Sequence, residues 1–263
     1  MIRHVVMDMD GVVYRGEVPV PGAIETMEAL HDQGVKVAYL TNNASRHRVD
    51  LVEKLRHMGL PCSVEQMWGS AYTTARYLFT EAPDAKIFAV GMPGMIREFE
   101  EVGLTVVPHY EQATHVVVGL DHDFTYEKLT CAHRAICNGA VFIATNLDVT
   151  FPDSPSTTVP GAGALAAALQ ASTGVTPKVI GKPQTTGISL IADSWGVEPE
   201  AIVAVGDRLD TDIAAAKAFG CVAALVLTGI ANRTDAAKAT GLHKPDVILQ
   251  DLTELIPLLS LSR

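Results

Sequence analysis

No stretch of this sequence reaches 18 uninterrupted apolar residues, so the sequence predicts no membrane-spanning helix. A secretory leader is not expected either, because Asp8 and Asp10 interrupt the apolar stretch at the start of the chain. Cysteine is scarce: the 4 cysteines form no CxxC pair and lack a zinc-binding spacing. These absences predict a cytoplasmic protein whose thiols are reduced and mostly buried.

Positive charge is also in short supply. The chain carries 20 Lys and Arg against 30 Asp and Glu, which gives a formal net charge of -10. A surface of that sign repels a phosphate backbone, so nucleic acid is not an expected partner. A small phosphorylated substrate is compatible with this charge, because a bound metal ion reverses the field locally.

Short apolar runs rich in Val and Ile alternate with amphipathic stretches along the 263 residues. This alternation is typical of a buried parallel sheet covered by helices, and it predicts an α/β fold with right-handed crossovers. The expected strands are Arg3–Met7, Lys36–Leu40, Lys86–Val90, His115–Val118, Val141–Ala144, Lys178–Ile180, Ala201–Val205, Val222–Leu227 and Asp246–Leu249.

The segment from Pro83 to Pro177 carries its own set of expected strands and helices. We interpret residues 83–177 as a domain inserted into a larger one, which residues 1–82 and 178–263 would form. Composition supports this division weakly, and the placement of the polar motifs on either side of the insert supports it better.

Two carboxylates follow the first expected strand, in Asp8-Met9-Asp10-Gly11. Ligands of open α/β sheets bind beyond the carboxyl ends of the strands, so both carboxylates can face such a crevice. A divalent cation between them would relieve their repulsion, and a carboxylate can also act as a nucleophile toward phosphorus. The alternative is a turn that uses Asp and Gly for its backbone conformation.

Polar side chains follow three more expected strands. Thr41-Asn42-Asn43 can cradle an anion or cap the next helix, and Gly181-Lys182-Pro183 offers either a phosphate-binding lysine or a surface charge. Asp207, Asp210 and Asp212 offer either a hard-cation site or an acidic helix start. Taken together, the nucleophile, acid, anion cradle, countercharge and metal ligands suit phosphoryl transfer.

In this order, the four motifs resemble those of the haloacid dehalogenase superfamily, most closely its NagD-like or p-nitrophenyl phosphatase branch. The resemblance spans nearly the whole chain. It implies a Rossmann-like core with a doubly wound parallel sheet, and an α/β cap of the C2 type inserted between Thr41 and Lys182. Further matches are Gly16, Pro21-Gly22, Ala144-Thr145-Asn146, Pro160-Gly161-Ala162-Gly163-Ala164 and Leu227-Thr228-Gly229.

The resemblance implies a role for each motif residue. Asp8 would be the nucleophile. Asp10 would protonate the leaving group and then activate the water that hydrolyses the aspartyl-phosphate. Thr41 and the Asn42 amide would hold phosphate oxygens, and Asn43 would orient the same loop.

A magnesium site is implied in the same way. Lys182 would neutralise the nucleophile and the phosphoryl group. Asp207 would bind Mg²⁺ together with Asp8 and the backbone carbonyl of Asp10, and Asp212 would orient a metal-bound water.

The cap loop over residues 146–158 would face the catalytic crevice in a protein of this family. Within it, Asp148 and Phe151 are candidates for substrate specificity, and an ordinary loop is the alternative interpretation. Proteins of the family often form homodimers through the cap, so a homodimer is a possible assembly.

We therefore predict a Mg²⁺-dependent phosphatase that hydrolyses small phosphomonoesters through an aspartyl-phosphate. Nucleoside monophosphates, pyridoxal phosphate, phosphoglycolate and sugar phosphates all fit the resemblance. The alternatives are a phosphotransferase or phosphomutase, and a catalytically silent protein that binds a phosphorylated ligand. The same resemblance implies that the carboxylate of Asp10 favours phosphoryl chemistry over carbon–halogen cleavage, because family members that cleave carbon–halogen bonds lack a carboxylate at this position.

Three other features carry predictions of their own. Gly161–Ala166 matches a dinucleotide-binding pattern, but no good strand leads into it, so we predict a tight turn that opens a helix. The histidine and aspartates of Asp121–Asp123 are expected to precede a helix start near Thr125 rather than bind a metal. His47 and His57 are predicted to lie on helix surfaces.

Overall fold

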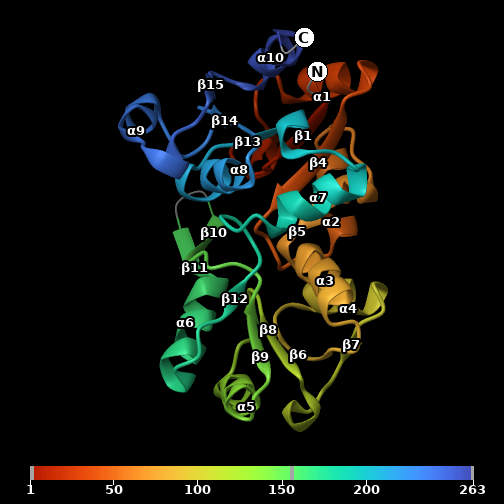
Figure 1. The fold of residues 1–263 in the computed structure, drawn as a ribbon, viewed down its shortest axis with the longest axis vertical. Helices are drawn as coiled ribbons and strands as arrows, with labels where there is room; N and C mark the ends of the chain where they lie inside the picture. Colours follow the sequence, from red (N-terminus) through yellow and green to blue (C-terminus); the bar gives the residue numbers. More distant parts are fainter. Residues whose placement is uncertain (1–2, 155–156, 262–263) are drawn as a thin grey trace. The chain divides into compact units, whose positions relative to one another are not determined.

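The computed structural model describes residues 3–154 and 157–261. The chain forms two compact units (Figure 1). The first contains the residues up to Thr41, Leu51–Trp68 and the residues from Lys182 onward. The second contains Asn42–Asp50 and Gly69–Gly181.

A six-stranded sheet with the order β15-β14-β13-β1-β4-β5 is the centre of the first unit. Its neighbours from β15 to β4 pair in parallel. The strands are β1 (His4–Met7), β4 (Lys36–Thr41), β5 (Met67–Gly69), β13 (Ile202–Gly206), β14 (Val222–Val226) and β15 (Val247–Leu249), and a separate hairpin joins β2 (Tyr14–Arg15) to β3 (Val18–Pro19).

The helices of this unit are α1 (Ala23–Asp32), α2 (Arg48–His57, whose first turn belongs to the second unit), α7 (Thr186–Trp195), α8 (Ala214–Phe219), α9 (Arg233–Lys238) and α10 (Leu255–Leu261). A π-helical turn, η4 (Leu209–Ile213), precedes α8. Short 3₁₀ turns lie at η1 (Val64–Gln66), η3 (Pro199–Ala201), η5 (Gly241–His243) and η6 (Leu252–Glu254).

A five-stranded parallel sheet with the order β12-β9-β8-β6-β7 forms the second unit. Its strands are β6 (Lys86–Val90), β7 (Thr105–Val106), β8 (His115–Val118), β9 (Val141–Ala144) and β12 (Lys178–Val179), with an antiparallel hairpin of β10 (Thr150–Ser154) and β11 (Thr157–Pro160). Its helices are α3 (Ser70–Glu81), α4 (Pro93–Glu101), α5 (Tyr126–Cys137) and α6 (Ala162–Thr173), with a 3₁₀ turn at η2 (Tyr110–Gln112).

Successive strand residues of the second unit bury their side chains on opposite faces of the sheet. Val117 of β8 packs with Met95 and Phe99 of α4, whereas Val116 and Val118 belong to the core under α5 and α6. In Figure 1, α3 and α4 lie on one side of this sheet and α5 and α6 on the other. Burial on both faces explains why its strands are short apolar runs without polar alternation.

The first unit shows the same arrangement. Val5 and Met7 of β1 face the core that includes residues of α1, α2 and the C-terminal segment. Val6 of β1 faces the other way, and Leu40 of β4 packs against Gly187 of α7. Each buried Val or Leu side chain stabilises the fold by about 1.5–3 kcal/mol, so the apolar runs decide where the sheet forms.

All nine expected strands are present, and each end lies within one residue of its predicted position. The α/β prediction is therefore confirmed. Within residues 3–154 and 157–261, six further strands escaped prediction: β2, β3, β5, β7, β10 and β11. They are hairpin or edge strands of two to five residues, which is too short for a periodic pattern.

The compact units differ in extent from the predicted domains. The second unit takes in Asn42–Asp50, begins again at Gly69 instead of residue 83, and ends at Gly181 instead of residue 177. The physical reason lies in α3: Ala71, Ala75 and Leu78 are buried in the same core as residues of α4. None of the helices among the described residues is long and apolar enough to cross a membrane.

Candidate active site

Strand register brings the first, second and fourth motifs to one edge of the six-stranded sheet. β1 lies between β4 and β13, and Met7 is in register with both Tyr39 and Val205. The next residue, Asp8, extends the ladder, since its backbone N–H donates to the Val205 carbonyl at 2.9 Å. Asp207 and Thr41 leave the neighbouring strands at the same level, so parallel pairing alone gathers these groups.

A buried lysine lies at the centre of this edge. The Nζ of Lys182 donates to Oδ1 of Asp8 at 2.5 Å and to the Leu40 carbonyl at 2.8 Å. It also forms an ion pair with Oδ1 of Asp212 at 2.7 Å. The Lys182 side chain is only 7% exposed, so its ammonium group depends on these acceptors rather than on bulk solvent.

The carboxylate of Asp212 connects the lysine to the loop after β13. Its Oδ2 accepts hydrogen bonds from the backbone N–H groups of Asp207 and Arg208, at 3.2 and 3.1 Å. Asp212 reaches this position from η4, and a side chain at Gly206 would overlap it. The glycine before Asp207 is therefore required for space.

Burial and mutual repulsion shift the pKa values of the acidic groups. Desolvation raises the pKa of Asp8 to about 7; Lys182 opposes the rise, and the charges of Asp212 and Asp207 add to it. Desolvation and Asp212 raise the pKa of Asp207 to about 6. Burial would lower the pKa of Lys182, but its pairs with Asp212 and Asp8 outweigh burial and raise it.

These carboxylates fit a hard divalent cation. Asp8, Asp207 and Asp212 each offer an oxygen within 4.8 Å of the others. With one lysine against three carboxylates, the fully ionised cluster carries about two uncompensated negative charges. Oxygen donors with surplus negative charge are the ligands that Mg²⁺ takes in proteins.

Asp10 and Thr41 belong to the same unit as this cluster. Asp10 is exposed and bridges to Tyr14 at the start of the β2–β3 hairpin. Desolvation raises the pKa of Asp10, while the charge of Lys54, the Gly11 backbone N–H and the charge of Arg15 oppose the rise. Thr41 is the last residue of β4 and is partly buried.

Asn42 follows Thr41 directly but makes its described contacts within the second unit. Its carbonyl accepts from Ser70 Oγ at 2.6 Å and from Asn146 Nδ2 at 2.7 Å. Its own Nδ2 donates to Oδ2 of Asp148 at 3.0 Å. Asp148 therefore orients the Asn42 amide, and Asn146 and Ser70, to which the sequence analysis gave no role, fix its backbone.

Asn43 and Phe151 also lie in the second unit. Oδ1 of Asn43 accepts from the backbone N–H and the hydroxyl of Ser45, at 2.8 and 2.7 Å, and so shapes its own loop. Phe151 is in β10, opposite Val159, and its ring lies 6.4 Å from that of His122 in an edge-on arrangement. The segment expected as a loop is therefore largely a β-hairpin.

The hairpin also changes one argument about Gly161–Ala166. β11 leads directly into this motif, so the expectation that no strand precedes it is wrong. β11 pairs antiparallel with β10, however, and a dinucleotide-binding βαβ unit needs a parallel strand. The predicted tight turn is confirmed: Gly161 precedes α6, and side chains at Gly161 and Gly163 would overlap the backbone near Asp148.

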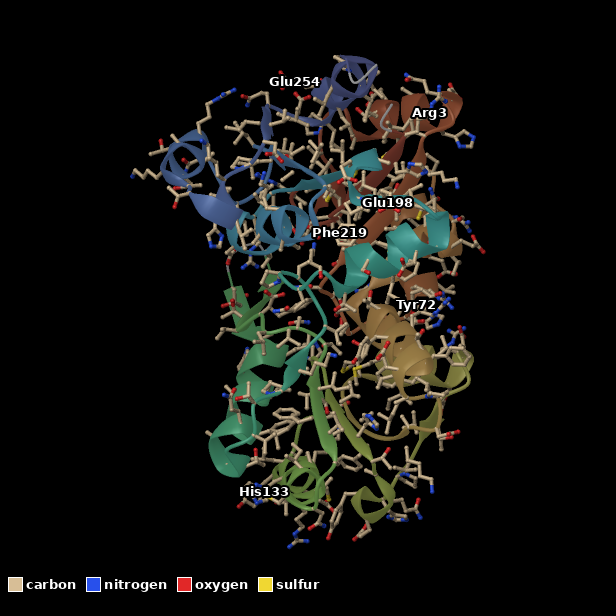
Figure 2. All side chains as sticks on the ribbon, in the orientation of Figure 1. Arg3, Tyr72, His133, Glu198, Phe219 and Glu254 are labelled. Carbon is tan, nitrogen blue, oxygen red and sulfur yellow. The ribbon has the colours of Figure 1, made fainter. Side chains whose placement is uncertain are left out.

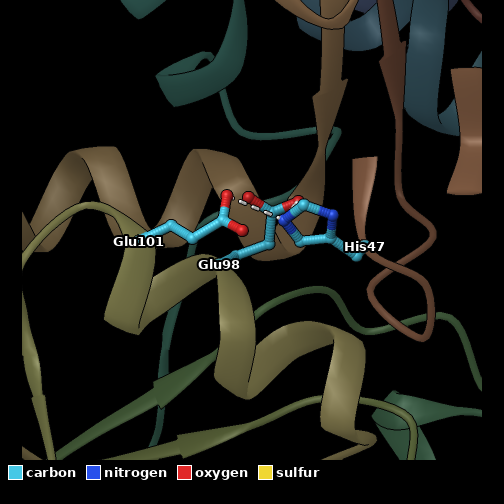
Figure 3. Close-up of side chains that lie close together, drawn as sticks. All are labelled: His47, Glu98 and Glu101. Carbon is cyan, nitrogen blue, oxygen red and sulfur yellow. Dashed lines mark hydrogen bonds and ion pairs between the residues drawn. The ribbon is translucent and has the colours of Figure 1, made fainter. Parts of the chain in front are cut away.

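His47 is not on a helix surface as predicted, because its side chain is 1% exposed. Figure 3 shows it beside Glu98 and Glu101 of α4. Its Nδ1 accepts from the Val49 backbone N–H at 3.3 Å, which assigns the ring proton to Nε2, and Nε2 lies 3.0 Å from Oε2 of Glu101. A periodicity argument missed this because His47 precedes α2 rather than lying within it.

The three residues in Figure 3 could geometrically hold a metal ion, but their charges are already matched. Glu98 accepts from the Arg48 backbone N–H at 2.7 Å and pairs with the Arg48 guanidinium at 3.3 Å. Glu101 pairs with Arg97 at 2.8 Å. The Arg48 guanidinium also lies 3.8 Å from the ring centre of Tyr72, which projects from α3 in Figure 2. We interpret the cluster as a structural ion network.

The helix start expected near Thr125 is confirmed. Asp121 pairs with Lys128 at 2.8 Å, and Thr125 caps α5 by accepting from the Lys128 backbone N–H. His57 is exposed and contacts the carbonyl of Glu53 in its own helix.

Comparisons with known proteins point to one family. A family model described as haloacid dehalogenase-like hydrolase matches residues 5–105, and a HAD-hydrolase-like model matches residues 179–255. A 5'-nucleotidase of Bacillus subtilis is 36% identical over 95% of this chain and 96% of its own.

Two solved structures extend the likeness to the whole fold. A p-nitrophenyl phosphatase from Archaeoglobus fulgidus is 34% identical with a TM-score of 0.91, over 98% of this chain and 99% of that one. A glycerol phosphate phosphatase from Mycobacterium tuberculosis, solved in complex with magnesium, is 33% identical with a TM-score of 0.88, over 97% of this chain and 76% of that one.

Proposed function

The chain belongs to the haloacid dehalogenase-like hydrolases and is a Mg²⁺-dependent phosphatase of small phosphomonoesters, and we propose that it works through an aspartyl-phosphate on Asp8. One observation carries the proposal for the residues. Lys182, itself buried, holds Asp8 at a sheet edge where Asp207 and Asp212 complete an acidic cluster.

In the proposed first step, a carboxylate oxygen of Asp8 forms a bond to phosphorus while the bond from phosphorus to the leaving oxygen breaks. Asp10 gives its proton to that oxygen, a task for which a raised pKa suits it. In the second step, Asp10 takes a proton from the water that attacks phosphorus. Inorganic phosphate leaves and the Asp8 carboxylate is restored.

Lys182 has two tasks in this proposal. It holds the Asp8 carboxylate in one orientation, and its charge stabilises the phosphoryl group as negative charge develops. Mg²⁺, held by Asp8, Asp207 and the Asp10 carbonyl, would supply further positive charge. Asp212 would fix both Lys182 and the Asp207 loop, as its contacts support.

The remaining sequence candidates stay proposals. We propose that Thr41 and the Asn42 amide hold phosphate oxygens, and that Asn43 shapes their loop, as its bonds to Ser45 support. Asp148 would act on specificity through the Asn42 amide, and Phe151 through direct contact with the leaving group. Exchange of Phe151 for Ala should then reorder substrate preference without changing the release rate of the smallest ester.

The substrate class stays broad, since the relatives carry names that refer to nucleotides, p-nitrophenyl phosphate and glycerol phosphate. We propose a small phosphorylated metabolite, a cytoplasmic location and a homodimer formed through the second unit. Four free cysteines support the location. Cell fractionation and light scattering would test the last two points.

The decisive experiment measures inorganic phosphate release from a panel of phosphomonoesters, with Mg²⁺ and with EDTA. Wild type should be active only with metal, and Asp8→Asn should be inactive but folded. Asp210→Asn is the matched control, because Asp210 is exposed and pairs with Arg208 at 2.9 Å. Near-normal turnover by Asp8→Asn would overturn the mechanism. Transfer to an added alcohol without phosphate release would indicate a phosphotransferase.

A further inference from the structure

The loop that follows β14, Thr228–Ala231, has no catalytic role in the proposed function, yet it encloses Asp207. The Ile230 backbone N–H donates to Oδ2 of Asp207 at 2.8 Å. The Ala231 backbone N–H donates to the Asp207 carbonyl at 3.0 Å. One loop therefore holds both the side chain and the backbone of this carboxylate residue.

Two glycines bring the backbone close to the same carboxylate. A Cβ atom at Gly229 or at Gly11 would overlap the Asp207 side chain. Gly11 also has a φ of +79°, whereas Gly229 has an ordinary φ, so Gly229 is required for space alone. Any larger residue at position 229 must push the Asp207 carboxylate out of place.

The loop is tied to the first motif at two points. The Thr228 hydroxyl donates to the Gly11 carbonyl at 2.7 Å, and the Arg15 guanidinium donates to the Gly229 carbonyl at 3.1 Å. The chain after Asp8 and the loop around Asp207 are thus fixed to each other as well as to the sheet.

Only one oxygen of Asp207 is used by these contacts. Across residues 3–154 and 157–261, its side-chain hydrogen bond goes to Oδ2, and Oδ1 has no hydrogen bond. A carboxylate held by a neighbouring backbone N–H at one oxygen presents the other in a fixed direction. This is how residues around a metal ligand tune its affinity.

We propose that Thr228–Ala231 is a positioning loop for the metal site, which orients Asp207 so that Oδ1 faces the cation. The hydrogen bond from Thr228 to the Gly11 carbonyl holds this loop in place. The importance of this loop for catalysis rests on the proposed function. Its prediction concerns metal affinity and can be measured without a substrate.

Isothermal titration of the metal-free protein with MgCl₂ tests the proposal. Gly229→Ala should weaken Mg²⁺ binding by about 10- to 100-fold. Thr228→Val removes one hydroxyl hydrogen bond without changing size and should weaken binding by about 2- to 10-fold. Thr228→Ser keeps the hydroxyl and should bind like wild type. Circular dichroism establishes that each variant is folded.

Thr130→Val is the matched control, because it removes a hydroxyl bond of 2.8 Å to the Tyr126 carbonyl within α5. It should leave Mg²⁺ affinity unchanged. Phosphate release at varied Mg²⁺ gives a second measurement: Thr228→Val should need more Mg²⁺ for half-maximal rate, with kcat at saturating metal within about twofold of wild type.

Wild-type affinity in a folded Thr228→Val, or equal losses in Thr228→Val and Thr228→Ser, would overturn the positioning role. An inactive wild type that binds Mg²⁺ would instead overturn the proposed function. In that case the titrations still decide whether the loop orients Asp207.

Discussion

Replacement of Lys182 by Met should destabilise the metal-free protein in a strongly pH-dependent way. Lys182 is 7% exposed, and its removal leaves the carboxylates of Asp8 and Asp212 buried without their cation. Removal of one partner from a buried ion pair costs about 3–5 kcal/mol. The matched change is Lys217→Met, since the Lys217–Asp246 pair is 30% and 39% exposed and should be worth at most about 1 kcal/mol.

The sign of the pH dependence follows from Asp8. Its pKa of about 7 in the folded protein exceeds its ordinary value of 3.8, so the folded state binds this proton more tightly. The contribution to stability is therefore complete below about pH 4 and is lost as the pH rises toward 7, by about 4 kcal/mol in all. Without the opposing charge of Lys182, that loss extends to higher pH.

Urea unfolding in EDTA at pH 5 and pH 8 measures the effect. The difference in unfolding free energy between wild type and Lys182→Met should reach about 3–5 kcal/mol at pH 8 and should be smaller at pH 5, where Asp8 is protonated. Lys217→Met should show about the same small loss at both values. Equal losses for the two variants at pH 8 would refute the interpretation of Lys182 as the essential buried countercharge.

Three further predictions follow from the same contacts. Asp8→Asn should raise the unfolding midpoint of the metal-free protein at pH 8, as seen by calorimetry, because it removes one charge from the cluster; a lower midpoint would contradict this. Mg²⁺ should raise the midpoint more at pH 8 than at pH 5.5, because protons compete for Asp8 and Asp207, whose pKa values are about 7 and 6; an equal shift would exclude these groups as ligands. Glu98→Ala should lower the free energy of unfolding in urea by about 3 kcal/mol, because Glu98 is 1% exposed. Glu101→Ala should lower it by about 1 kcal/mol or less, because Glu101 is 37% exposed. Unchanged Mg²⁺ affinity in both variants would separate this network from the metal site.

The main sheets could be predicted because burial on both faces leaves a distinct signal. Val5, Val6 and Met7 are all buried, so β1 is a continuous apolar run followed at once by Asp8. Strands such as β11 (Thr157–Pro160) are half-exposed or exposed and contain proline, so they carry no comparable pattern. The sequence also could not show that α3 belongs to the second unit. An amphipathic helix has the same apolar pattern whichever core it packs against.

The site could be predicted as far as parallel register alone assembles it. Asp8 and Asp207 follow two strands of this sheet and Thr41 ends a third, and the sequence shows these positions directly. Lys182 is different: it does not end a strand of that sheet, and only the fold shows its bonds to Asp8 and the Leu40 carbonyl. His47 could not be placed at all, because its burial depends on Glu98, which is 51 residues away in sequence.

The charge balance of the site also determines the order in which Mg²⁺ and phosphate bind. Asp8, Asp207 and Asp212 against Lys182 leave about two negative charges when all are ionised, and a phosphomonoester dianion would add two more. Two like charges about 4 Å apart repel each other by about 4 kcal/mol even at an effective dielectric constant near 20. The summed repulsion between the phosphate and the carboxylates therefore exceeds the attraction that one lysine supplies. Mg²⁺ must therefore bind before or together with the phosphate. Inorganic phosphate titrated into the metal-free protein should give no binding heat, and prior addition of MgCl₂ should restore it. Equal phosphate affinity with and without Mg²⁺ would mean that the anion site lies away from this cluster.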